Sequence, residues 1–110
     1  LVSKATLQNI TVNISSYAVS LDDKGVPYVE QGLFGGRYFL NNVVENVTFN
    51  VEGYEVYRLM SRVCKGNTFV NVKIYADGYQ TIGDSDDNDS VINELPVGVE
   101  FISTKTSNER

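Results

Sequence analysis

Aromatic and cationic side chains share one face of a predicted strand, a combination that suits a flat, negatively charged ligand. Phe69, Lys73 and Tyr75 have one parity, and the residues between them are mainly apolar. Aromatic rings stack on nucleic acid bases with ~1–3 kcal/mol each, while Lys and Arg contact phosphates. The candidate residues are Lys24, Tyr28, Phe34, Arg37, Tyr38, Phe69, Lys73 and Tyr75. They predict a site for single-stranded nucleic acid, and the alternative is that these rings fill a core or a subunit interface.

Catalytic chemistry has few candidate residues in this chain. No histidine is present, which excludes Ser-His-Asp, Cys-His and His-metal sites. Cys64 lies beside Lys65, but a cysteine near the end of an amphipathic segment is more often a small packed residue than an activated thiol. We therefore expect no enzymatic activity and no cofactor.

An acidic run resembles part of a calcium loop. Asp84, Asp86 and Asn88 have the alternate spacing of the first calcium ligands. Asp89 stands where that loop needs glycine, and Leu95 stands where it needs a bidentate glutamate. The expectation is a solvated acidic loop over 83–90 without a metal.

Four asparagines match the glycosylation sequon, which matters only in a secreted protein. They are Asn9, Asn13, Asn46 and Asn88. Three of them fall within predicted strands, so we interpret the matches as chance in an asparagine-rich sequence.

The net charge of −5 argues weakly against a nucleic acid ligand, because phosphates are bound through Lys and Arg. Residues 1–82 carry seven basic and seven acidic side chains, and the whole negative excess lies in 83–110. A positive groove elsewhere on the surface is compatible with this distribution.

Hydrophobic periodicity indicates five strands and one helix. Alternation predicts strands over 6–21, with a bulge at Ser15-Ser16, and over 26–40, where glycines mark bends or close backbone approach. Further strands are predicted around 47–51, over 69–79 with Val70, Val72, Ile74 and Ala76 facing the core, and around 97–101. Val56, Leu59, Met60 and Val63 have helical spacing and predict a helix between 53 and 66. No internal repeat is detected.

This order of elements predicts an all-β fold, a five-stranded oligonucleotide-binding (OB) barrel with one α-helix between strands 3 and 4. The 110 residues suit a single domain over 1–110, with the acidic loop and a polar C-terminal tail over 104–110. No apolar run reaches the roughly 20 residues of a membrane span, and a lone cysteine gives no sign of an oxidising compartment. We expect a cytoplasmic protein without a membrane partner.

A family resemblance adds to these expectations. One stretch resembles the strand of filamentous-phage single-stranded DNA-binding proteins that begins with Lys-Pro-Tyr; it reads Lys24-Gly25-Val26-Pro27-Tyr28, followed by Glu30-Gln31. In length, element order and acidic, asparagine-rich composition, the chain is similar to the small OB-fold single-stranded DNA-binding proteins of lactococcal phages. That resemblance implies sequence-independent binding of single-stranded DNA in phage replication or recombination, in the host cytoplasm.

The resemblance also implies a homodimer or higher homo-oligomer, with replication or recombination proteins as possible partners. The main alternative is a structural or interaction module, such as a virion or tail component, whose aromatic face serves subunit assembly. A third interpretation is a carbohydrate-binding toxin subunit, which also uses an OB barrel; the absence of a cysteine pair counts against it.

Overall fold

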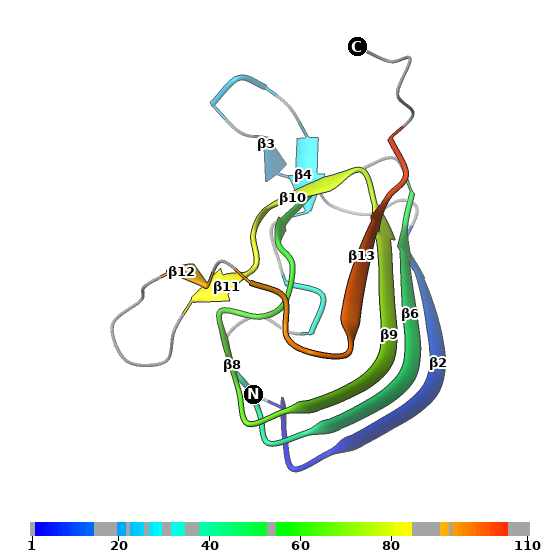
Figure 1. The fold of residues 1–110 in the computed structure, drawn as a ribbon. Helices are drawn as coiled ribbons and strands as arrows, with labels where there is room; N and C mark the ends of the chain where they lie inside the picture. The colour runs from blue at the N-terminus through cyan, green and yellow to red at the C-terminus, as the bar shows by residue number, and fades with distance from the viewer. Residues whose placement is uncertain are drawn as a thin grey trace.

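The chain forms a β-solenoid, in which successive coils stack on one another (Figure 1). The computed structural model describes residues 2–14, 20–21, 23–25, 27–29, 32–34, 38–52, 55–84, 91–92 and 94–105. Its strands are β1 (Val2–Ser3), β2 (Thr6–Ile14), β3 (Ser20–Leu21), β4 (Pro27–Val29), β5 (Tyr38–Leu40), β6 (Val43–Val51), β7 (Glu55–Arg58), β8 (Val63–Lys65), β9 (Thr68–Ala76), β10 (Gly78–Thr81), β11 (Gly83–Asp84), β12 (Val91–Ile92) and β13 (Val99–Ser103).

Three sheets form the sides of the solenoid, and each of the first three coils contributes a strand to each sheet. The sheet orders are β1-β5-β8-β11-β12, β2-β6-β9-β13 and β10-β7-β4-β3. The first coil is β1, β2 and β4; the second is β5, β6 and β7; the third is β8, β9 and β10; the fourth begins with β11 and ends with β13. Strands from successive coils pair in parallel, while β3 and β12 pair antiparallel at the ends of their sheets.

The predicted OB barrel is wrong, because each of these sheets has two ends and none closes on itself. The predicted helix is also wrong, since no α-helix occurs among the residues that the structure describes. Its segment forms β7, a corner at 59–62, and β8. Val56, Leu59, Met60 and Val63 are all buried. The buried residues of two strands and the corner between them thus have, by coincidence, the sequence spacing expected for one apolar face of a helix.

The first two predicted strands were also too long. The segment 6–21 divides into β2 and β3, and 26–40 divides into β4 and β5 around a turn at Leu33-Phe34. The predicted bulge at Ser15-Ser16, and Gly35 and Gly36, lie outside the described residues. Gly32 confirms the expected close backbone approach, because a Cβ there would lie 1.8 Å from the Met60 carbonyl oxygen of the next coil.

A stack of left-handed residues bends the longest strands. Asn9, Asn46 and Asn71 have φ values of 56°, 54° and 52° and occupy equivalent places in β2, β6 and β9. Asn46 Nδ2 donates to Asn9 Oδ1 at 3.1 Å, and Asn71 Nδ2 donates to Asn46 Oδ1 at 2.9 Å. Asparagine tolerates this conformation better than other non-glycine residues. Two of the predicted sequons, at Asn9 and Asn46, therefore belong to a structural ladder.

The bend at Asn71 reverses which side chains of β9 face the core. After it Val72, Ile74 and Ala76 are buried, as predicted. Before it Phe69 is buried and Val70 is 48% exposed, which is the opposite of the prediction. A single residue in the left-handed region changes the alternation of side chains along the strand. The predicted strand over 69–79 thus contains most of β9 but runs on into β10, and its assignment of faces held for only one half of β9.

A second asparagine ladder lies inside another corner. Asn42 Oδ1 accepts the Ala5 N–H at 2.8 Å, and Asn67 Oδ1 accepts the Asn42 N–H at 2.8 Å. Asn42 Nδ2 donates to the Val2 carbonyl, and Asn67 Nδ2 donates to the Phe39 carbonyl. Because buried amides need partners, the repeated contacts satisfy the corner and hold neighbouring coils in register.

The remaining predicted segments agree in part with the structure. β6 contains the predicted third strand, and β13 contains most of the fifth. Gly83 pairs with Ile92, and Asp84 with Val91, so an antiparallel hairpin flanks the acidic run. Residues 85–90 of that run, and 106–110 of the predicted tail, lie outside the described residues.

Candidate functional site

The described residues of the predicted nucleic acid site do not lie on one surface. Phe34 and Phe69 lie in the core, 5% and 7% exposed, with ring centroids 5.7 Å apart. Neither ring is positioned to stack on a base without unfolding the solenoid. They were predicted to face a ligand because the bend at Asn71 and the turn at 33–34 are not visible in the alternation.

The other predicted residues are dispersed. Lys73 and Tyr75 share the outward face of β9, Tyr38 is exposed on β5 in a different sheet, and Lys24 is exposed in the turn after β3. The backbone of Tyr28 belongs to β4, its side chain lies outside the description, and Arg37 is not among the described residues. Among the described side chains of the predicted set, only Lys73 and Tyr75 are brought together on one outward face.

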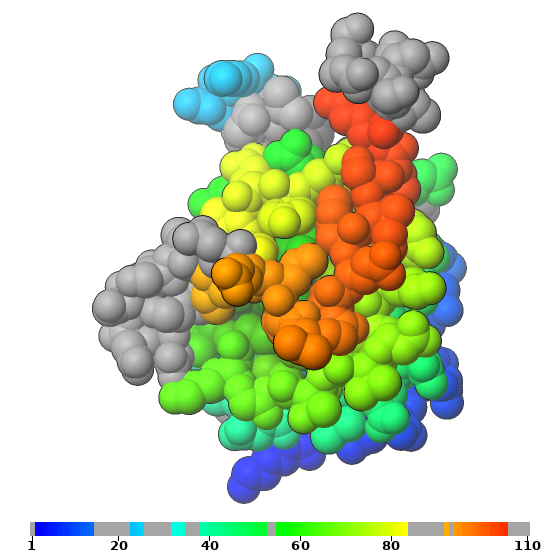
Figure 2. Space-filling model, viewed as in Figure 1, coloured from blue at the N-terminus to red at the C-terminus, as the bar shows by residue number. Residues whose placement is uncertain are grey.

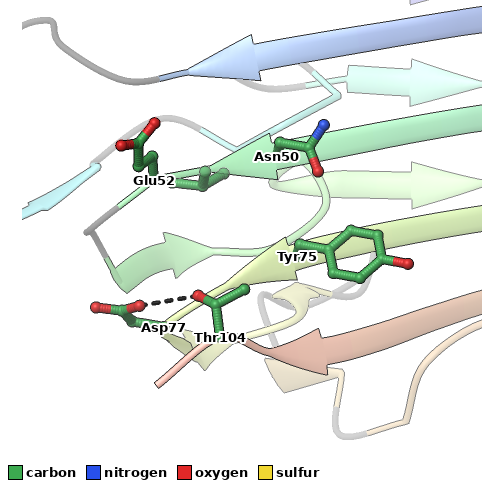
Figure 3. A pocket seen from close by; sticks show the side chains of 6 residues that line it. Asn50, Glu52, Tyr75, Asp77 and Thr104 are labelled. Carbon is green, nitrogen blue, oxygen red and sulfur yellow. Dashed lines mark hydrogen bonds between the residues drawn. The ribbon is translucent and has the colours of Figure 1, made fainter. Parts of the chain in front are cut away.

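One candidate site is an open groove of about 410 Å³ where β6 and β9 end. It is lined by Asn50, Val51, Glu52, Tyr75, Asp77 and Thr104 (Figure 3). Asn50 and Tyr75 are register partners, and Glu52 and Asp77 follow them by two residues each. Sequence reasoning found only Tyr75, because Asn50 and Glu52 belong to the preceding coil and become its neighbours only through the strand register.

Hydrogen bonds hold the polar groups of this groove. Thr104 Oγ1 donates to Asp77 Oδ1 at 2.9 Å, and the Thr104 amide donates to the Ala76 carbonyl at 2.9 Å. Asn50 Nδ2 donates to Asn13 Oδ1 at 2.8 Å. The Asp77 carboxylate and the Asn50 amide are thereby positioned before any ligand arrives.

The second candidate site is the end of the solenoid formed by the first coil. An apolar cavity of about 320 Å³ opens there. The first two coils and the turn between them line it, with the residues Val2, Leu7, Ile10, Val12, Leu33, Phe34, Phe39, Val47 and Phe49. β2 is also the last strand of its sheet, so one row of its backbone amides and carbonyls faces away from β6.

Equivalent positions in successive coils show that the described residues leave this end uncovered. Ile10, Val47 and Val72 are register partners that point into the solenoid. Their exposed fractions are 36%, 2% and 1%. Ile10 therefore has an interior position that no coil among the described residues covers.

The opposite end is covered by the chain itself. Val99 belongs to the main hydrophobic cluster, and Ile92, Leu95 and Phe101 pack against that cluster. Figure 2 shows residues 94–105, in orange and red, lying across the face that is turned to the viewer. The two ends of the solenoid are thus unequal, and the first coil presents the open one.

Cys64 is a packed residue, as predicted. Asn67 Nδ2 donates to its Sγ at 3.3 Å, and the side chain packs against the core. Burial raises the pKa of the Cys64 thiol from 9.0 to about 11, although hydrogen bonds from Asn67 and Ser61 oppose the rise. A raised pKa leaves little thiolate, the reactive species, at neutral pH.

We therefore expect native protein to react slowly with a thiol reagent at pH 8 and urea-unfolded protein to react quickly. The unfolded thiol ionises first, so the stability contributed by Cys64 is complete below pH 9 and is lost as the pH rises toward 11. Urea unfolding of wild type and Cys64→Ala across this range measures the effect. An equal pH dependence in the two proteins would contradict it.

Metal and membrane sites were searched as well. No group of three or more His, Cys, Asp or Glu side chains able to hold a metal occurs in the described part of the chain. Within the same residues, no helix is long and apolar enough to cross a membrane.

Comparison with protein-family models, with curated proteins and with solved structures gave no match. The fold and its two candidate sites define a β-solenoid module with one open end and one polar groove. Its function is argued from that geometry.

Proposed function

We propose that the chain is a non-catalytic interaction module that assembles through the open end of its solenoid, and that the partner is a second copy of the same chain. The single observation that carries the proposal is the exposure of Ile10, whose equivalents in the next two coils are almost completely buried. An interior apolar position is left in water only at the cost of the free energy that its burial would provide.

The open end combines what a strand-pairing interface needs. β2 extends over nine residues at the edge of its sheet, a length that favours pairing with another strand. Beside it, Leu7, Ile10 and Val12 face the apolar cavity. A partner that pairs with β2 and covers this cavity satisfies the backbone and buries the apolar side chains together.

Because one end of the solenoid is open and the other is covered, we expect two copies of the chain to pair about a two-fold axis. The described residues of the last coil already cover their own end, so a head-to-tail stack would place an open end against a covered one. Two open ends placed together bury both cavities and form a closed, isologous dimer. This proposal keeps the subunit assembly of the alternative considered from the sequence, but the contact surface is the apolar open end in place of the predicted aromatic face. Among the described residues that line the cavity, Phe34 is the one shared with the predicted aromatic set, and it is buried.

Binding of single-stranded DNA stays a prediction that awaits a test. Lys73 and Tyr75 are the part of the predicted set that shares one exposed face. A fluorescence titration with labelled oligo-dT in low salt tests it, because phosphate contacts are strongest there. Absence of binding at micromolar protein would contradict that prediction without affecting the assembly proposal.

Sedimentation of the wild-type chain over a concentration series tests the assembly proposal. We expect a monomer–dimer equilibrium with a dissociation constant of about 1–100 µM. Ile10→Asp places a charge in the apolar end and is expected to weaken dimerisation by at least about tenfold, because an unpaired charge is costly to bury. Ile10 is partly exposed in the monomer, so the variant should retain the wild-type circular dichroism spectrum.

Thr11→Asp is the matched control. Thr11 is exposed, follows Ile10 in the sequence and lies on the outer face of β2. The substitution therefore adds the same charge to the same strand, but outside the interface. Three results would each overturn the proposal: a wild-type monomer at about 1 mM, an equal loss of dimer in both variants, or open-ended oligomers in place of a dimer.

A further inference from the structure

We propose that the groove at the ends of β6 and β9 is a binding site for an organic cation with an alkylammonium or guanidinium head. The site is independent of the assembly interface, since the groove and the open-end cavity share no lining residue. Its ligand class follows from the chemistry of the six side chains that line it.

The groove offers mainly hydrogen-bond acceptors. Asn50 uses its amide nitrogen for Asn13, and Figure 3 shows its amide oxygen on the side of Tyr75. Asp77 and Glu52 supply carboxylate oxygens, which only accept hydrogen bonds when ionised. A ligand that donates several hydrogen bonds is therefore favoured over one that accepts them.

Hydrogen bonds fix the orientation of the Asp77 carboxylate. Thr104 Oγ1 occupies Asp77 Oδ1, and Ser103 Oγ donates to the Asp77 backbone carbonyl at 3.2 Å. The second carboxylate oxygen, Oδ2, then has a defined direction. Hydrogen bonds between a carboxylate and a cation are roughly twice as strong as neutral ones, and a positioned acceptor loses less entropy on binding.

Tyr75 adds an aromatic wall. In Figure 3 its ring lies on one side of the groove, and Glu52 and Asp77 lie on the other. A cation above a tyrosine face gains about 0.5–1 kcal/mol at an exposed site, and more when water is excluded.

The charge of the surroundings agrees with a cationic ligand. The groove is lined by two carboxylates and by no lysine or arginine among the described residues. Lys73 lies on the same face, but its register partner on β13 is Glu100, and opposite charges on neighbouring strands offset one another. A phosphate or another anion would meet two carboxylates and is disfavoured.

Two probes carry the head groups without assuming where the ligand comes from. Spermidine presents alkylammonium groups, and the peptide acetyl-Gly-Arg-Gly-amide presents a guanidinium. We expect each to shift the amide resonances of residues 50–52 and 75–77 of the ¹⁵N-labelled chain, with dissociation constants of about 0.1–1 mM in low salt. Affinity should fall as salt is added, because exposed charge pairs are screened.

Variants assign the contacts to the groove. We expect the double variant Glu52→Gln and Asp77→Asn to bind at least about tenfold more weakly, and Tyr75→Leu to bind about threefold more weakly. Tyr75→Phe retains the ring and should bind as the wild type does. Glu100→Gln removes one charge from the same face outside the groove and is the matched control.

Several results would overturn the proposal. These are no shift with either probe up to about 10 mM, equal weakening by Glu100→Gln and by the double variant, or equal shifts with the neutral sugar maltotriose, which would assign the groove to hydroxyl recognition instead. Urea unfolding of each variant separates a lost contact from a lost fold.

Discussion

Replacing Asn42 with alanine is expected to lower the free energy of unfolding by about 3–5 kcal/mol. The side chain is 1% exposed and joins three coils. Its Oδ1 accepts the Ala5 N–H, and its Nδ2 donates to the Val2 carbonyl at 3.2 Å and to Asn67 Oδ1 at 3.0 Å. The variant leaves the Ala5 amide without its acceptor inside a packed corner, and an unsatisfied buried donor costs more than a lost surface hydrogen bond.

Asn50→Ala is the matched control for this variant. Asn50 also links two coils, through its hydrogen bond to Asn13, but this contact lies on the exposed outer face. We expect a cost of about 0.5–1.5 kcal/mol, because water replaces the lost partner. Urea unfolding of the two variants and the wild type measures both losses of unfolding free energy. Equal costs for the two variants would show that the interior ladder does not hold the coils together.

Gly98→Ala is expected to destabilise the chain by about 3 kcal/mol or more. Gly98 has a φ of +94°, and a Cβ there would lie 1.9 Å from the Phe69 carbonyl oxygen. That oxygen belongs to the backbone of the preceding coil and has no rotamer through which to move away. The fourth coil must therefore separate from the third, which uncovers the core at that end.

Gly25→Ala distinguishes this clash from ordinary backbone strain. Gly25 also has a positive φ, +80°, but an added Cβ meets nothing within 4 Å. Only the strain of a left-handed alanine remains, about 1–2 kcal/mol. If Gly98→Ala costs no more than Gly25→Ala in urea unfolding, the close packing of the third and fourth coils is contradicted.

The sequence revealed where the strands lie better than it revealed how they assemble. Alternation located most of β9 and parts of β6 and β13, because a strand with one buried side carries its period in local residues. It could not tell a helix from two strands joined by a corner at Leu59 to Arg62. Both arrangements bury Val56, Leu59, Met60 and Val63, and burial is what the pattern reports.

The repeat was missed because successive coils differ in length. Thr6, Val43 and Thr68 are register partners, so the first coil is 37 residues long and the second is 25. Insertions of this size hide a fixed period. The remaining signal was the spacing Asn42-x-x-x-Asn46-Val47, which recurs as Asn67-x-x-x-Asn71-Val72. The first asparagine of this spacing belongs to the ladder of Asn42 and Asn67 inside the corner, and the second belongs to the exposed ladder of Asn9, Asn46 and Asn71.

The candidate sites were less predictable than the strands. Both are built from neighbours in space that belong to different coils, such as Asn50 beside Tyr75. Sequence reasoning selected Tyr75 for its ring and its predicted outward direction, and the groove confirms that direction. It had no means of pairing Tyr75 with Asn50 until the coil register was known, and it placed Phe69 outside because Asn71 reverses the alternation.

Hydrogen exchange of the β2 amides tests most directly the central claim that the open end is an interface. Those β2 amides that do not bond to β6 lie at the sheet edge in a monomer and exchange quickly with water. Above the dissociation constant, we predict that they become protected in the wild type and in Thr11→Asp but not in Ile10→Asp. Fast exchange of these amides in the wild type at every concentration would contradict the claim.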